Sequence, residues 1–266
     1  MIVFIASIGR LALSIPTMIG RITHMFLNGL YDLSKVMLGR YDYDVFRWVL
    51  RLTRQQVWFT GVQVLPLILG IASFFSVSLL ILGYQNLRAV GAEAHFGQII
   101  RFGVIGGLGP LLVALIVIAR SGTAITADVA SQAIRGEIDV MRLHGVSSSI
   151  IVVIPRLLGV WISTVVLTTL FIVTIFVGFV VVTPLLKLQV TEILMVTIDA
   201  LLPMDILTLM IKSSVFGLLI PLITVDKGLN VKRDIRDLPR VSSQAVVACI
   251  ISVFVLDVII SILVLL

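Results

Sequence analysis

The chain has 266 residues, of which 59% are hydrophobic and only 13% carry a charge. A soluble domain of this length would carry roughly 25% charged residues, so the composition excludes a soluble domain and predicts one integral membrane domain spanning residues 1–266. The net charge of +6 would suggest nucleic-acid binding in a soluble protein, but here a cytoplasmic bias of basic residues and anionic headgroups explain it better.

The stretch before the first long apolar run is amphipathic. Residues 21–38 have helical periodicity, with an apolar face made of Ile22, Phe26, Leu30, Leu33 and Met37. After them, Arg47, Arg51 and Arg54 recur at spacings of four and three beside aromatic and aliphatic residues. This pattern predicts that residues 1–56 form an interfacial segment whose basic side chains face lipid headgroups. A cytosolic helix packed on a partner protein is the alternative.

Five apolar runs are long enough to cross a bilayer, because a spanning helix needs about 20 residues. They cover roughly residues 57–83, 99–119, 149–182, 206–225 and 244–266. The third exceeds one span and is expected to tilt, kink or extend beyond the bilayer, while the fourth is interrupted by Lys212 and Pro221. We predict an all-α membrane protein in which residues 57–266 form a bundle of about five transmembrane helices, with four or six as alternatives.

Basic residues are distributed unevenly among the segments between these runs. Sixteen of the 20 lie before the first run or in the second and fourth connections. The other four are Arg88, Arg101, Lys187 and Lys212. Because cytoplasmic segments are enriched in Lys and Arg, we expect the amino terminus and both basic connections in the cytoplasm. With five spans, the carboxyl terminus would lie outside.

The connection between the second and third runs carries most of the candidate functional residues. It contains Asp128, Arg135, Glu137, Asp139 and Arg142. We predict a short cytoplasmic coupling helix, about residues 124–145, which ends near Gly145 and receives force from a nucleotide-driven partner. An ordinary solvated loop helix is the alternative. Arg120 and Arg156 would fix the ends of the second and third spans near the cytoplasmic face.

No motif for catalysis or metal binding is found in the sequence. It has no G-x-x-x-x-G-K-[ST] phosphate loop, no H-E-x-x-H and no G-x-S-x-G. The histidines His24, His95 and His144 are far apart and in different predicted regions. We therefore expect no catalytic residue, bound cofactor or metal in this chain, and any ATP to be bound by a partner ATPase.

Two charges and a run of glycines lie within the predicted spans. Charges there cost about 2.5–3.5 kcal/mol on insertion scales and usually face a cavity or a partner. Lys212 and Asp257 could pair, or Lys212 could extend to the interface, and either a structural or a pathway role is open for both. Small residues before Gly109 and Pro110 favour close helix packing, with a hinge or a cavity as the alternative.

Several short motifs recur at consistent spacing. The string LGPLLVALIVIARSGTAITADV, which begins at Leu108, is similar to L-G-P-x-x-A-A-L-x-x-A-G-R-S-G-[ST]-A-x-x-A-E. Later strings are RLHGV from Arg142, VIPRLL from Val153 and KSSVFG from Lys212, and Asp257 lies in the last run. Together they resemble the MlaE (YrbE-type) family of lipid-transporting ABC permeases over most of the chain.

This resemblance implies a fold with an interfacial helix, five spans and a cytoplasmic coupling helix. It implies a multi-pass protein of the inner membrane of a double-membraned bacterium, paired with a second permease copy and with ABC ATPase subunits. An MCE-domain protein and a small STAS-type accessory protein are the other implied partners. The implied function is to move phospholipid or similar hydrophobic molecules between the inner and outer membranes.

The chain also departs from the family pattern at several positions. Gly107 stands where the family usually has a Glu before L-G-P, and Asp128 replaces a Glu. In the predicted coupling helix the family's leading acid aligns with Gly136, and Glu137 follows one place later. The chain is therefore expected to be a divergent member. A membrane scaffold that anchors a soluble or periplasmic complex and transports nothing is the alternative function, and an intramembrane enzyme is a weaker third.

Overall fold

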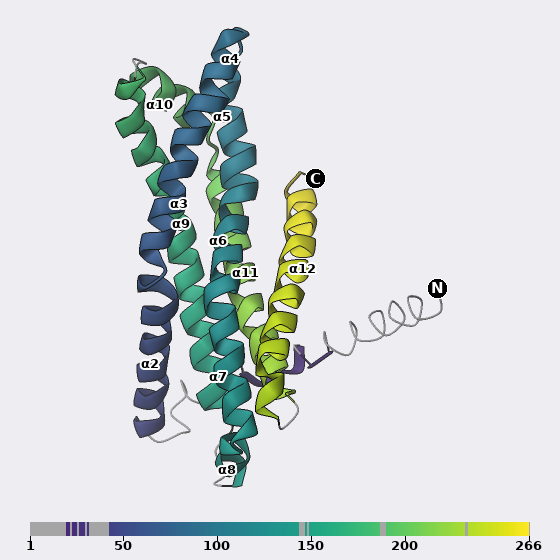
Figure 1. Cartoon of the computed structure of the whole chain (residues 1–266). Coiled ribbons are helices and arrows are strands. Elements are labelled where there is room, and N and C mark those ends of the chain that lie inside the picture. The colour runs from purple at the N-terminus through teal and green to yellow at the C-terminus, as the bar shows by residue number, and fades with distance from the viewer. Residues whose placement is uncertain are drawn as a thin grey trace.

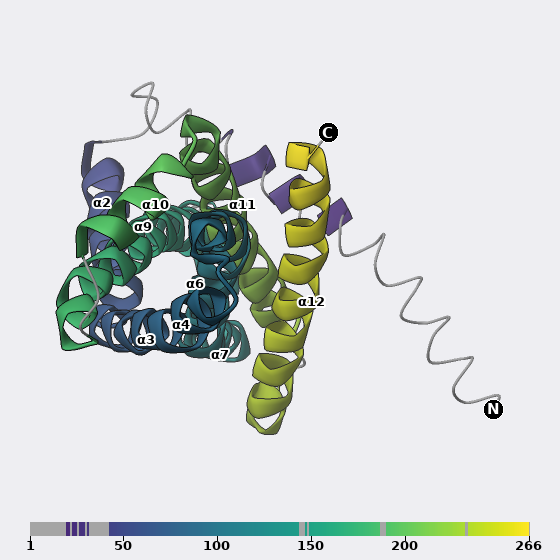
Figure 2. The same ribbon diagram turned by 90° about the horizontal axis from the view of Figure 1, so that it is seen from above.

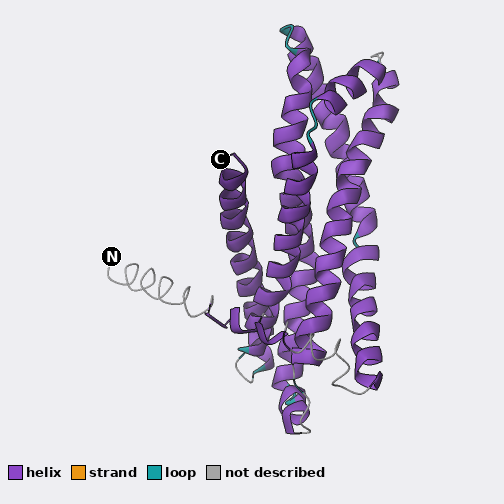
Figure 3. Cartoon of the chain, turned by 180° about the vertical axis from the view of Figure 1, so that it is seen from behind, coloured by secondary structure: helices purple, strands orange, loops and turns teal. Residues whose placement is uncertain are grey.

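The computed structural model describes residues 20–21, 23–25, 27–29, 31, 43–143, 147, 149–186, 190–231 and 234–265. These residues are almost entirely helical, and no strand occurs among them (Figure 3). Five helices in this part of the chain are long and apolar enough to cross a membrane: Val45–Ala89, Glu93–Ile134, Ser149–Leu185, Pro203–Leu229 and Ile235–Val264. The predicted all-α fold with five spans is confirmed.

The first span begins well before the apolar run that predicted it. Helices α2 (Tyr43–Val57), α3 (Leu65–Ser78) and α4 (Gln85–Ala89) follow one another along a single rod, joined by wider π-helical turns (Figure 1). At 1.5 Å per residue, the 45-residue apolar helix is about 68 Å long, more than the roughly 40–45 Å of a whole bilayer. The rod therefore extends beyond the membrane.

The expected break at residue 56, between an interfacial segment and the bundle, is absent. Val49 in α2 is buried against Ile150 and Ile154 at the start of the third span. The amphipathic pattern of Arg47, Arg51 and Arg54 arises because one side of α2 packs on another helix while the other side stays exposed. Periodicity alone does not distinguish a helix that covers a protein surface from one that covers a lipid surface.

The second span also continues past its predicted end. It runs through α5 (Phe96–Ile99), a π-helix at Ile100–Leu108, α6 (Gly109–Val117), a π-helical turn at Ile118–Gly122 and α7 (Thr123–Ile134). Gly136 then adopts a φ of 75°, which favours glycine and ends the rod. A short helix, α8 (Glu137–Leu143), follows. The predicted coupling helix of residues 124–145 is therefore two helices, since α7 belongs to the span and only α8 lies beyond it.

The third span, α9 (Ile154–Leu185), lies among the other long helices. It packs against α2, α3, α6, α10 (Val190–Asp199) and α11 (Pro203–Leu229), and Figure 2 gives the view along the bundle. Gly178 permits close contact with Ser76 of α3, whose hydroxyl donates a hydrogen bond to the carbonyl of Ile175 at 3.0 Å. Gly217 of α11 permits a similarly close contact on another side of α9, because a Cβ at residue 217 would lie 3.0 Å from the Cα of Trp161 in α9. These small residues allow α9 to touch both neighbours along their backbones.

The remaining helices complete the bundle. Helix α10 (Val190–Asp199) packs against α5 and α9, α11 (Pro203–Leu229) is the fourth span, and α12 (Leu238–Leu265) is the fifth. In Figures 1 and 2, α12 lies at the side of the bundle, next to α11 and α7. It exposes a stripe of aliphatic side chains formed by Val247, Ile251, Val255, Val258 and Ile262.

One end of the bundle collects basic side chains, and we call it the basic end. There α2, α9 and α12 begin and α7 and α11 end. The described residues between 20 and 31 are helical and cross this end at a steep angle to the long helices (Figures 1 and 3). The remainder of the predicted amphipathic segment, residues 32–38, lies outside the described residues. The predicted interfacial role of this segment stays a prediction.

Candidate functional site

A buried ion pair joins the second, fourth and fifth spans. Lys212 of α11 is 0% exposed, and its Nζ donates hydrogen bonds to Asp257 Oδ1 at 2.7 Å and Ser261 Oγ at 2.8 Å, both on α12. The third bond goes to the carbonyl oxygen of Gly106 at 2.6 Å. An ammonium group has three N–H donors, so each finds one oxygen. Of the two alternatives for Lys212, pairing with Asp257 or extension to the interface, the structure shows the pairing.

The carbonyl of Gly106 lies four residues before Pro110. In an α-helix that carbonyl would accept a bond from the backbone N–H of residue 110, and proline has none. The segment that contains Gly106 is π-helical, and Lys212 donates to this carbonyl from another span. Sequence reasoning singled out Pro110 as a break but did not foresee the contact between Lys212 and Gly106.

Gly109 lies where the second span approaches the third. A Cβ at this position would be 2.9 Å from Ile172 Cδ1 of α9 and 2.6 Å from the carbonyl oxygen of Val104. Close packing, the simpler of the two readings of the glycine run, accounts for Gly109. The ion pair and this contact together hold the second span against three other helices.

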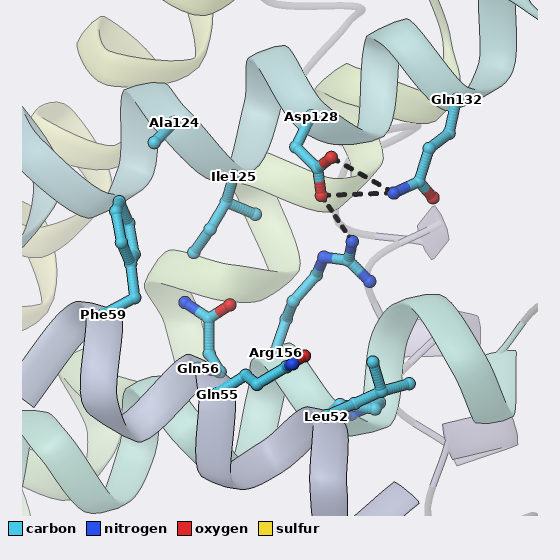
Figure 4. Close-up of a pocket in the computed structure, with 10 residues that line it drawn as sticks. Leu52, Gln55, Gln56, Phe59, Ala124, Ile125, Asp128, Gln132 and Arg156 are labelled. Carbon is cyan, nitrogen blue, oxygen red and sulfur yellow. Dashed lines mark hydrogen bonds and ion pairs between the residues drawn. The ribbon is translucent and has the colours of Figure 1, made fainter. Parts of the chain in front are cut away.

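A second polar cluster lies at the basic end, in a pocket of about 510 Å³ between α2, α7 and α9. Figure 4 shows Asp128 and Gln132 on α7 facing Arg156, with Gln55, Gln56 and Phe59 of the first rod opposite. Arg156 Nη2 lies 2.6 Å from Asp128 Oδ2, and Gln132 Nε2 donates to both oxygens of the same carboxylate at 3.2 Å. Asp128 and Arg156, assigned separate roles from sequence, are thus partners.

The guanidinium of Arg156 is held from two sides. Besides Asp128, its Nη1 donates to the carbonyl oxygens of Val152 at 2.9 Å and Ile151 at 3.3 Å. Pro155 lies four residues after Ile151, so the carbonyl of Ile151 again lacks an α-helical donor. Arg156 is mostly buried, whereas Asp128 is 55% exposed. The arrangement ties α7 to the first turn of α9.

The helix of the second span continues past Arg120 to Ile134. Its Nη2 donates to Gln63 Oε1 at 3.2 Å, and its guanidinium lies 5.7 Å from the ring centroid of Phe59. Both partners belong to the first rod. Arg120 therefore links the first and second spans, and its position near the cytoplasmic face stays a prediction.

The tip beyond Gly136 carries the other residues expected to contact an ATPase. Arg135 and Glu137 form a loose, exposed pair with a distance of 3.7 Å between Arg135 Nη1 and Glu137 Oε1. Ile138 is buried, whereas Val140 and Leu143 are exposed, Leu143 by 85%. Asp139 is half-buried. The side chain of Arg142 lies outside the described residues. An exposed tip with charged and aliphatic side chains is suited to contact with another protein.

Two further polar contacts have no counterpart in the sequence analysis. At the opposite end, Arg101 Nε donates to Asp205 Oδ2 at 2.8 Å and Oδ1 at 3.0 Å, and Asp205 also accepts a bond from the backbone N–H of Leu202 at 2.7 Å. An acid three residues into a helix is a capping signal that could have identified Asp205, but nothing local points to Arg101.

The other unforeseen contact lies at the basic end. Asp226 is 1% exposed, and its Oδ1 accepts a bond from Asn230 Nδ2 at 3.0 Å and lies 3.2 Å from Arg21 Nε. Its Oδ2 is buried without a hydrogen-bond partner in the described part of the chain. This contact places the described amino-terminal helix against the end of α11.

Comparison with known proteins gives one consistent family. The family model described as Permease MlaE matches residues 53–263. A probable ABC transporter permease protein of Rickettsia prowazekii is 28% identical over 200 residues, which are 74% of this chain and 77% of that protein.

Two relatives have more specific names. The intermembrane phospholipid transport system permease protein MlaE of Haemophilus influenzae is 27% identical over 169 residues, 64% of this chain and 61% of that protein. The chloroplastic protein TRIGALACTOSYLDIACYLGLYCEROL 1 of Arabidopsis thaliana is 24% identical over 212 residues, 79% of this chain and 61% of that protein.

Proposed function

Since this chain belongs to the MlaE permease family of ABC transporters, we propose that it carries phospholipid or a similarly hydrophobic molecule between the inner and outer membranes of a bacterium, driven by a separate ATPase. The observation that carries this proposal is the family match over residues 53–263, which includes three of the five helices long enough to cross the membrane and most of the first and the last. The name of the Haemophilus influenzae relative, a phospholipid transport permease, supports the substrate class.

The basic end is proposed to face the cytoplasm. Arg47, Arg54, Arg135, Arg156 and Arg240 all lie there, and cytoplasmic segments are enriched in such residues. In this orientation the amino terminus is cytoplasmic, and α4, α10 and the start of α11 lie on the far side of the inner membrane. An MCE-domain protein on that side is the proposed recipient or donor of the lipid.

The ATPase is proposed to contact α8 and the end of α7. This tip extends furthest from the bundle at the basic end (Figure 1), and it exposes Arg135, Glu137, Val140 and Leu143. Because α7 is continuous with the second span, a push on α8 would be transmitted along a rigid helix to Gly109 and the Lys212 cluster. The chain has no phosphate loop of its own, so the ATP would be bound by the partner.

A second copy of the chain is the proposed partner within the membrane. The stripe of Val247, Ile251, Val255, Val258 and Ile262 on α12 is exposed and lies on one helix face. A small STAS-type accessory protein on the cytoplasmic side is also proposed, by family resemblance alone.

Copurification tests partner and substrate together. The chain is extracted from native membranes in a mild detergent, and bound proteins and lipids are identified by mass spectrometry. We expect an ABC ATPase, an MCE-domain protein and bound phospholipid. A scaffold would instead retain protein partners without lipid and would show no ATP-dependent lipid transfer after reconstitution, and that result would overturn the transport proposal.

A further inference from the structure

One face of the first rod carries an ordered row of exposed side chains. Arg47, Arg51, Arg54 and Trp58 occur at spacings of four, three and four, which places them on one face of α2 and of the turn that follows it. We call this row the α2 stripe. All four side chains are exposed, Trp58 by 59%.

Two surface grooves run along the α2 stripe and meet at Arg54. The first, of about 490 Å³, is lined by Arg47, Leu50, Arg51 and Arg54. The second, of about 620 Å³, begins at Arg54 and continues past Trp58 to Val62 and Gln63. The side chains that line the two grooves thus change from basic to aromatic to aliphatic along the direction in which the rod enters the bundle.

The positive charges of Arg51 and Arg54 have no acidic partner among the residues that the structure describes. In the described part of the chain no carboxylate forms an ion pair with Arg51 or Arg54, and the guanidinium of Arg51 lies 5.5 Å from the ring centroid of Trp48. An exposed pair of arginines, one of which lies over an aromatic ring, is complementary to an anionic group at the level of the membrane interface.

The depth of each arginine follows from the helix rise. At 1.5 Å per residue, Arg54 lies about 6 Å, Arg51 about 10 Å and Arg47 about 16 Å from Trp58 along the axis. Trp prefers the membrane–water interface, and each headgroup layer is about 5–8 Å thick. Arg54 therefore falls in the headgroup layer, Arg51 reaches it with its long side chain, and Arg47 lies beyond it in water.

We propose that Arg51, Arg54 and Trp58 of the α2 stripe bind an anionic phospholipid of the adjacent leaflet, with the headgroup phosphate on Arg51 and Arg54 and an acyl chain along Trp58 and Val62, while Arg47 takes no part. The exposed aliphatic and aromatic side chains of α3, among them Leu67 and Phe74, continue the apolar surface toward the membrane centre, where acyl chains can cover them. The assignment to the cytoplasmic leaflet rests on the proposed orientation, but the site itself does not require that the chain transport lipid.

The test uses Trp58 as the reporter. The full chain has three tryptophans, and Trp48→Phe with Trp161→Phe leaves Trp58 alone. Trp48→Phe keeps a ring beside Arg51, and Trp161→Phe removes no described hydrogen bond, because Trp161 Nε1 has none. The chain is reconstituted in phosphatidylcholine vesicles that contain either brominated phosphatidylglycerol or brominated phosphatidylcholine at the same mole fraction, and quenching of Trp58 fluorescence is compared.

We expect phosphatidylglycerol to quench more strongly, and Arg54→Gln and Arg51→Gln each to lower its relative association constant about fivefold. Arg54→Lys keeps the charge and should keep most of the preference for phosphatidylglycerol. Arg47→Gln is the matched control, because Arg47 lies beyond the headgroup layer.

Equal quenching by the two lipids in the parent chain, or an equal loss with Arg47→Gln, would overturn the proposal. The proposal would also be overturned if Arg54→Gln left the quenching unchanged but abolished ATPase copurification, because the α2 stripe would then be a contact with a protein. Transport is measured separately, so its failure would not be mistaken for failure of this site.

Discussion

Lys212 and Asp257 lie in different spans and meet with 2.7 Å between Nζ and Oδ1, where Ser261 and the carbonyl of Gly106 complete the ring of acceptors around the ammonium. Removing one partner would leave the other charge buried and unpaired, which costs about 3–5 kcal/mol. Replacing both by apolar residues of similar size removes that penalty, so single and double variants behave differently.

The first prediction therefore compares Asp257→Ala with the double variant Lys212→Met/Asp257→Leu. Asp257→Ala should be destabilised by about 3–5 kcal/mol, and the double variant should recover most of the loss. The single cysteine, Cys249, is buried in α12, so a fluorogenic thiol reagent reports unfolding in detergent. Equal instability of the two variants would contradict the pairing. Full lipid transport by a stable double variant would exclude a pathway role for both charges.

The second prediction concerns Arg156 and Asp128. Because Asp128 is 55% exposed, Asp128→Asn should cost at most about 1 kcal/mol. Arg156→Ala should cost more, about 2–3 kcal/mol, since two main-chain carbonyls also lose their donor. The charge swap Asp128→Arg/Arg156→Asp should not restore stability, because an acid beside the carbonyls of Ile151 and Val152 adds repulsion. A rescue by the swap, in the same thiol assay, would show that the carbonyl bonds are unimportant.

The third prediction concerns helix spacing. Gly217→Ala should destabilise the bundle by about 1–3 kcal/mol, because the added Cβ would lie 3.0 Å from Trp161 Cα, an atom of the α9 backbone. Gly70→Ala is the matched control in a helix of the first rod, where no atom lies within 4 Å of an added Cβ. It should be neutral or slightly more stable, since glycine is a poor helix former. Equal unfolding temperatures for both variants would contradict the close approach of α9 and α11.

The fourth prediction tests the proposed ATPase contact. Glu137→Lys should leave the protein inserted and folded but lower transport about tenfold, a loss of ~1.4 kcal/mol in the contact. Arg88→Glu, an exposed charge reversal at the opposite end of the bundle, is the control and should leave transport unchanged. Transport in reconstituted vesicles and ATPase copurification are measured in parallel. Normal values of both for Glu137→Lys would contradict a role for α8.

Hydrophobic run length was enough to predict the five spans, and the cost of charge in a bilayer was enough to make pairing with Asp257 one of two alternatives for Lys212. Sequence reasoning placed helix ends where polarity rises, after Arg54 and Arg120, yet both helices continue. Polarity marks where a helix leaves apolar surroundings, whereas a helix ends where its backbone can no longer continue. Gly136, with its φ of 75°, is such a position.

The long-range contacts could not be predicted from local patterns. Arg101 and Asp205 are separated by 104 positions and Arg21 and Asp226 by still more, so no periodicity links them. Asp128 and Arg156 were both noticed, but each was assigned to a different task, because sequence spacing does not reveal that α7 and α9 face each other across a pocket. Such pairings depend on helix packing, which the amphipathic pattern of each helix constrains only weakly.

Two cations in the described part of the chain bond to main-chain carbonyls that lie four residues before a proline: Lys212 to Gly106 before Pro110, and Arg156 to Ile151 before Pro155. An anchor of this kind belongs to the main chain, so no change of side chain at residues 106 or 151 can delete it. The positions at which substitution is expected to disturb this anchor are therefore the prolines, four residues further along the helix. A mutational scan interpreted only from side-chain contacts would therefore underrate Pro110 and Pro155, because neither proline forms a hydrogen bond with the cation.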